Sequence, residues 1–191
     1  MYKQCKTEQS AARQRSLELE MLRMMISQRY EDISVSDLCQ RSGIPRKSFY
    51  RYFTSKDGAL HGLLDHTLRD YFLCRQPWEG ERKLRKELEC FFRCWLQNKK
   101  LLDVLRRSNL SGLLIERAVL FALEQDPGSN SGLTEDERQL RRQRITFAVC
   151  GLMSTVLAWH SDGCVQSPGE LAAVTERLVV QPLYPALERF L

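Results

Sequence analysis

The sequence of 191 residues lacks the features of secreted, membrane-bound and zinc-binding proteins. No apolar run reaches the ~18–20 residues needed to cross a bilayer, and the first residues lack the apolar segment of a signal peptide. None of the seven cysteines belongs to a Cys-x-x-Cys pair, so we expect neither a disulfide framework nor a metal site. These absences favour a cytoplasmic protein with reduced thiols and no membrane partner.

Catalytic motifs are missing as well. The sequence contains no Gly-rich phosphate loop, no Gly-x-Ser-x-Gly elbow, no His-Glu-x-x-His pair and no credible catalytic triad. We therefore expect the protein not to be an enzyme and to need no cofactor.

The positive charge is concentrated near the N-terminus. Residues 1–57 contain eleven Lys/Arg against seven Asp/Glu, whereas residues 58–191 contain eighteen against seventeen. The segment 41–56 contains five basic residues and no acidic one. A basic run alone is most often a solvated face. The aromatic residues within this run favour a nucleic-acid-binding surface instead.

Apolar residues recur at helical spacing along most of the chain, which predicts an all-α fold. Helix start signals of the Ser/Thr-x-x-Asp/Glu type occur at Ser34, Thr134 and Ser167. A cluster of Pro, Gly, Ser and Asn at 126–132 predicts a loop. The expected helices cover 10–28, 34–42, 45–53, 55–72, 83–97, 101–107, 110–124, 134–159 and a last segment from 167.

The segment 35–53 has the pattern of a helix-turn-helix. Leu38 and Cys39 can pack against the following helix, Gly43 permits a sharp turn, Ile44 can fill the corner, and Phe49 can anchor the second helix from behind. The outer face of that helix would then be free to enter the major groove of DNA. A generic helical hairpin is the alternative, and the basic, tyrosine-bearing outer face argues against it.

The segments 33–38, 42–44 and 48–56 resemble the TetR family of bacterial transcriptional regulators in order and spacing. The resemblance implies a three-helix DNA-binding domain over residues 1–56 and a helical-bundle regulatory and dimerisation domain over 57–191. It implies phosphate contacts from Tyr50, Tyr52 and Lys56, and base-edge positions for Arg46, Lys47 and Ser48. The expected DNA-binding set is Ser34, Val35, Arg46, Lys47, Ser48, Tyr50, Arg51, Tyr52 and Lys56.

This sequence departs from the usual family pattern at four positions. Arg29 stands where a glycine commonly ends the first helix, and Pro45 replaces a common polar cap. Lys47 replaces a frequent glycine, and Tyr52 replaces a frequent histidine. The extra lysine could contact either a base or a phosphate, so direct readout of the operator at that position stays open.

The helix expected over 134–159 carries apolar residues on one side, at Ile145, Ala148, Leu152, Val156 and Trp159. The opposite side is small or apolar, so the helix needs two partners. A second subunit is one explanation, and a central core helix in a monomer is the other. A homodimer would read a two-fold symmetric operator in double-stranded DNA. The expected dimer-interface residues are Phe147, Cys150, Gly151, Ser154, Thr155 and Ala158.

TetR proteins usually sense a small molecule in the C-terminal domain, so the resemblance implies a repressor released by an effector. Ordinary core packing is the alternative for each candidate ligand residue. An activator of the same fold, or an adaptor that binds protein through the basic helix, are alternative functions. The candidate ligand residues are His66, Phe91, Cys94, Trp95 and Trp159.

Overall fold

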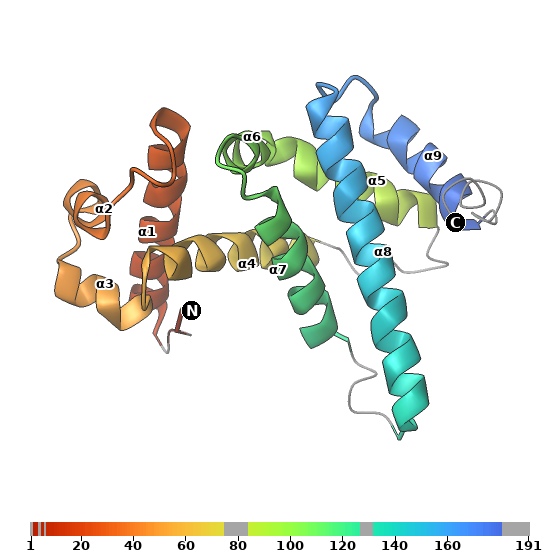
Figure 1. Ribbon diagram of the computed structural model, residues 1–191, viewed down its shortest axis with the longest axis horizontal. Helices are drawn as coiled ribbons and strands as arrows, with labels where there is room; N and C mark the ends of the chain where they lie inside the picture. The colour runs from red at the N-terminus through yellow and green to blue at the C-terminus, as the bar shows by residue number, and fades with distance from the viewer. Residues whose placement is uncertain (1, 4, 6, 75–83, 127–131, 181–191) are drawn as a thin grey trace.

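The computed structural model describes residues 2–3, 5, 7–74, 84–126 and 132–180 (Figure 1). The prediction of an all-α fold is confirmed, since the regular structure of these residues is helical apart from one isolated antiparallel bridge between Tyr2 and Phe53. The helices are α1 (Glu8–Ser27), α2 (Val35–Ser42), α3 (Arg46–Tyr52), α4 (Lys56–Cys74), α5 (Leu84–Gln97), α6 (Lys99–Arg107), α7 (Ser111–Glu124), α8 (Glu135–Ser161) and α9 (Pro168–Val180).

Local signals set the starts of α2, α8 and α9. The Ser34 hydroxyl accepts a hydrogen bond from the Asp37 amide, and the Asp37 carboxylate accepts one from the Ser34 amide. Thr134 with Glu137 and Ser167 with Glu170 repeat this arrangement. Each pair satisfies two backbone donors that a helix start leaves without intrahelical partners. All three predicted caps are therefore confirmed.

Helices α1, α2 and α3 form a three-helix unit at one end of the molecule, and α4 runs from this unit into the remaining helices (Figure 1). The predicted inner face of α1 is buried, with Leu17, Met21 and Met25 fully shielded from solvent. α4 packs against α1 and, further along, against α7. It therefore belongs to both halves of the molecule.

The packing of α1 against α4 depends on a glycine. A Cβ atom at Gly62 would lie 2.6 Å from Oε1 of Glu18 and 3.2 Å from a ring carbon of Phe53. Glu18 is completely buried, and its other carboxylate oxygen lies 3.2 Å from Arg15 Nη1 and 2.7 Å from His66 Nδ1. The close approach of the two helices thus buries an ion-pair cluster between the N-terminal unit and α4.

The prediction for the apolar side of α8 is only partly correct. Val156 and Trp159 are buried, but Ala148 is exposed, and Met153 and His160 are buried instead. The buried stripe is displaced around the helix by about one residue from the predicted one, because Met153 and His160 directly follow Leu152 and Trp159. α8 has 27 residues and α7 has 14, which at ~1.5 Å per residue leaves the first turns of α8 beyond the end of α7 (Figure 1).

Two sequence predictions fall partly or wholly outside the described residues. Most of the predicted loop at 126–132 lies there, and so do the last residues of the proposed C-terminal domain. Pro45 differs by one position from its expected place, because it precedes α3 as the N-cap residue rather than occupying the first turn. Within the described part of the chain, no helix is both long and apolar enough to cross a membrane.

Candidate nucleic-acid interface

The turn between α2 and α3 has the geometry that the sequence predicts. Gly43 adopts φ +66°, a left-handed conformation that is costly for other residues. The Ile44 amide donates to the carbonyl oxygen of Cys39 at 3.1 Å and closes the turn. Leu38 and Cys39 are buried beneath it, so the two helices are held in a fixed relation.

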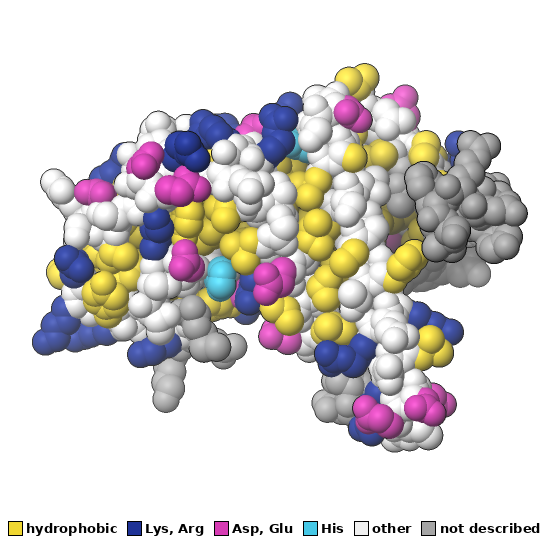
Figure 2. All heavy atoms as spheres, viewed as in Figure 1, with side chains coloured by type: hydrophobic (Ala, Val, Ile, Leu, Met, Phe, Trp, Pro, Cys, Tyr) yellow, Lys and Arg dark blue, Asp and Glu magenta, His cyan; other side chains and the backbone are white. Residues whose placement is uncertain are grey.

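α3 has one buried and one exposed face. Phe49 is fully buried, and its ring centroid lies 5.3 Å from that of Phe53. On the other face Lys47, Tyr50 and Arg51 are exposed, with 46% of Tyr50 accessible. Basic side chains line the edge of the molecule where α3 lies (Figures 1 and 2). A short helix is therefore anchored by an aromatic core and presents positive charge outward.

Arg46 connects the two helices of the motif. Its Nη1 donates to the Ser36 hydroxyl on α2 at 3.1 Å. A hydrogen bond to Tyr50, one turn further along α3, raises the pKa of Arg46 above its usual range. The Arg46 side chain is exposed in this position. Its guanidinium can exchange these local contacts for a base or phosphate at little cost.

The two remaining phosphate-binding candidates lie differently from the sequence prediction. Tyr52 is only 8% exposed, so it belongs to the inner face of α3 rather than beside Tyr50. Lys56 is half-buried, and its ammonium donates to the carbonyl oxygens of Tyr30 at 2.8 Å and Glu31 at 3.2 Å. The Tyr30 hydroxyl in turn donates to Asp57. Lys56 thereby fastens the segment between α1 and α2 to the start of α4.

The other predicted members of the site occupy the start of α2 and the first turn of α3. Ser34 is exposed and caps α2, and Val35 is half-buried behind it. Ser48 is half-buried in the first turn of α3. Of the nine candidates, Tyr52 is the buried one. Lys56 is half-buried and bonded to two backbone carbonyl groups, and the other seven lie at least partly on the surface of the motif.

The five candidate ligand residues do not converge on one place. Phe91 and Trp95 pack edge-on at 6.4 Å on α5, where Cys94 is half-buried, and Trp159 on α8 donates from Nε1 to the Gln166 carbonyl. His66 lies apart from them, on α4, against Glu18 of α1. The five residues therefore do not line one pocket together, and their part in effector binding stays a prediction. Among the described residues no group of three or more His, Cys, Asp and Glu side chains could hold a metal ion.

The predicted dimer face of α8 is open in the single chain. Phe147 is 69% exposed, Gly151, Ser154 and Ala158 are exposed, and Cys150 and Thr155 are half-buried. Three apolar side chains near the end of α9 are also exposed, Leu178, Val179 and Val180. Phe147 and these three residues therefore leave apolar side chains exposed on two C-terminal helices.

Comparison with known proteins identifies the N-terminal unit. Residues 22–62 match the model of the tetR family of bacterial regulatory proteins. This match identifies the segment 22–62, which includes α2 and α3, as similar to the DNA-binding part of that family. The "HTH-type transcriptional regulator EthR" of Mycolicibacterium smegmatis (strain ATCC 700084 / mc(2)155) is 33% identical over 76 residues, which cover 37% of this chain. The matched part spans only 35% of that relative's length.

A likeness in fold extends beyond the segment that sequence comparison matches. The solved structure of the fatty acid degradation regulator FadR from Bacillus halodurans aligns with a TM-score of 0.56 over 94% of this chain and 98% of that one. The sequence identity is 17%, so this likeness concerns the fold alone. It covers the helices of both halves of the molecule.

Proposed function

We propose that this protein is a sequence-specific, DNA-binding transcriptional regulator of the TetR family that acts as a homodimer in the cytoplasm. The observation that carries the proposal is the outer face of α3. This helix contains no acidic residue, and its exposed side chains are Arg46, Lys47, Tyr50 and Arg51. On the opposite face the buried Phe49 anchors the helix in the core. The major groove admits one α-helix, and Arg and Lys donate to both phosphates and guanine edges. The role is regulatory and not enzymatic.

The experiment that tests this function is selection of duplexes by the full-length protein from a random pool, followed by measurement of the dissociation constants. We expect enrichment of a two-fold symmetric site with half-sites about one helical turn, ~34 Å, apart. We also expect binding at least about 10³-fold tighter than to a scrambled duplex at physiological salt. Weak binding that ignores sequence would instead support the adaptor that docks its basic helix on an acidic protein.

A homodimer is supported by the apolar face of α8. Replacing Phe147 by Asp places a charge at the large exposed apolar residue of this face, so we expect the protein to sediment as a monomer at concentrations where the wild type is a dimer. Ile26→Asp is the matched control, because Ile26 is also an exposed apolar residue, at 46%, but lies on α1. If Phe147→Asp stayed dimeric and Ile26→Asp became monomeric, the interface would lie on α1 and not on α8.

The direction of regulation follows the family pattern in this proposal: a repressor that leaves its operator when an effector binds the C-terminal helices. An activator with the same DNA contacts is the second candidate. Expression of a reporter joined to the selected operator distinguishes the two. Deleting the gene raises output if the protein represses and lowers it if the protein activates.

A further inference from the structure

The residues before α1 form an arm, here defined as Tyr2, Lys3 and Cys5, that contacts both the recognition helix and α4. The Lys3 amide donates to the carbonyl oxygen of Tyr52 at 2.9 Å, and Tyr2 pairs with Phe53 in the isolated bridge. The Tyr2 ring centroid lies 5.8 Å from that of His66 on α4. The arm therefore joins the end of α3 to the middle of α4.

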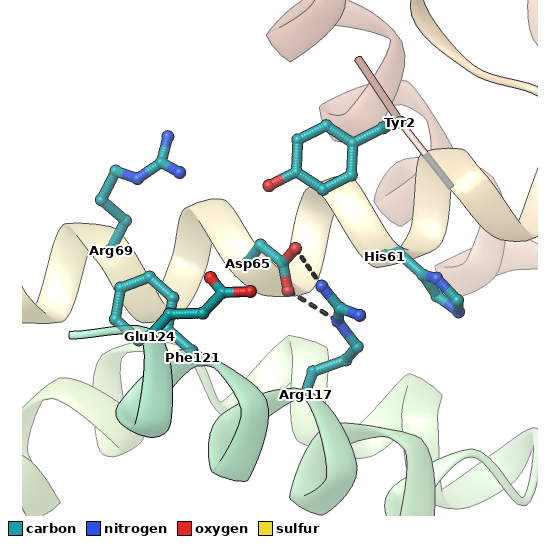
Figure 3. Close-up of a pocket in the computed structure, with 7 residues that line it drawn as sticks. All are labelled: Tyr2, His61, Asp65, Arg69, Arg117, Phe121 and Glu124. Atoms are coloured by element: carbon teal, nitrogen blue, oxygen red, sulfur yellow. Dashed lines mark hydrogen bonds and ion pairs between the residues drawn. The ribbon is translucent and has the colours of Figure 1, made fainter. Parts of the chain in front are cut away.

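Two cavities flank this arm and share Tyr2 and Arg69. The larger, of about 450 Å³, lies between α4 and α7 (Figure 3). The smaller, of about 310 Å³, lies between α1 and α4. The larger is lined by Tyr2, His61, Asp65, Arg69, Arg117, Phe121 and Glu124, and the smaller by Tyr2, Cys5, Ala11, Gln14, His66 and Arg69.

Arg69 supplies uncompensated positive charge to the shared wall. Arg117 is neutralised by a bidentate ion pair with Asp65, whereas Arg69 has no ion pair among the described residues (Figure 3). Burial and the neighbouring Asp65 raise the pKa of Tyr2 to about 12, so its hydroxyl stays neutral beside them. Glu124, the one other acidic residue of the larger lining, is exposed to solvent.

A second donor in the smaller cavity lacks a partner. Gln14 is only 2% exposed, and its side-chain nitrogen makes no hydrogen bond although its oxygen accepts one from Cys5 Sγ at 2.8 Å. Buried amide groups are nearly always satisfied, so an orphaned donor that lines a cavity calls for an acceptor there. The lining of the smaller cavity contains no carboxylate of its own.

We propose that this site binds a small organic carboxylate, which accepts hydrogen bonds from Arg69 and the Gln14 amide while its apolar part extends past Tyr2 towards Phe121. Hydrogen bonds between a guanidinium and a carboxylate are stronger than those between neutral groups, because both partners are charged. The bound molecule contacts Tyr2, and the arm is hydrogen-bonded to the end of α3, so occupancy changes the position of the recognition helix. This second part rests on the DNA-binding function proposed above.

The first test measures binding to the full-length protein by calorimetry, with benzoate and hexanoate as probes and benzamide and hexanamide as uncharged counterparts. We expect both carboxylates to bind at least about tenfold more tightly than their amides. Arg69→Gln should lower carboxylate affinity about tenfold or more, whereas Arg106→Gln, at an exposed position on α6, should leave it unchanged. Absence of carboxylate binding, or binding that survives Arg69→Gln, overturns the proposal.

Gln14→Leu separates a binding role from a structural one. The substitution removes a buried donor that has no partner and an acceptor bonded only to the Cys5 thiol, a weak donor. We therefore expect little loss of thermal stability but a several-fold loss of carboxylate affinity. If stability falls and affinity does not, Gln14 is only a packing residue and the assigned contact is wrong.

The coupling is tested by repeating the DNA titration with saturating benzoate. We expect the dissociation constant of the selected duplex to change several-fold for the wild type and not for Arg69→Gln. An unchanged constant despite saturation overturns the coupling through the arm. If carboxylates bind as expected but no duplex is selected, the proposed DNA-binding function fails and the carboxylate site stands.

Discussion

Replacing Lys47 and Arg51 together by glutamine should lower the affinity for the selected duplex at least about a hundredfold. A dimer would lose four positive charges, and each charge-assisted hydrogen bond contributes about 1.5–3 kcal/mol. The dependence of log affinity on log salt should also become flatter, by about 0.9 for each phosphate that the variant no longer neutralises. Fluorescence anisotropy of a labelled duplex at several salt concentrations measures both effects.

The matched control for this pair is Lys100→Gln with Arg142→Gln. It removes the same charge from exposed positions on α6 and α8. If affinity fell equally in both double variants, net charge alone would explain binding, and the surface of α3 would not be the DNA interface. Equal folding of the variants is checked by their circular dichroism.

The helices could be predicted from sequence because their signals are local. At Ser34, Thr134 and Ser167 the cap and the acidic residue three positions later lie within one turn, so no tertiary contact is needed to form the pair. The turn at Gly43 is local for the same reason. The helix-turn-helix follows from these signals together with the apolar residues of α1 at helical spacing, Leu17, Met21, Met24 and Met25.

The directions of single side chains depend on contacts far along the chain, and these could not be predicted. Tyr52 was expected on the outer face, but it packs inward where the arm crosses the end of α3. Lys56 was expected to face DNA, but the carbonyl groups of Tyr30 and Glu31 lie within reach of its ammonium. Its contact with phosphate stays a prediction that requires these bonds to be exchanged.

The ligand candidates illustrate the same limit in the C-terminal helices. His66 and Trp95 were ligand candidates because of their residue types, but the helix packing places His66 against Glu18 on α1. The cavities beside the arm involve Tyr2 and Arg69, which carry no sequence signal for ligand binding because their spacing fits no motif. Only the close approach of α1, α4 and α7 brings them together.

Phe49→Ala should destabilise the N-terminal unit by about 3–5 kcal/mol, the usual loss when a large aromatic side chain is deleted from a packed core. Phe49 is fully buried and contacts the Phe53 ring, so its truncation leaves a cavity in the core. Urea denaturation followed by far-ultraviolet circular dichroism measures the loss.

Tyr50→Ala is the adjacent control on the same helix. Because 46% of Tyr50 is exposed, we expect its replacement to change stability by less than about 1 kcal/mol but to cause a clear loss of DNA affinity. The reverse pattern, with Tyr50 stabilising the fold and Phe49 dispensable for it, would mean that α3 faces the solvent with its other side and that the interface assigned to it is wrong.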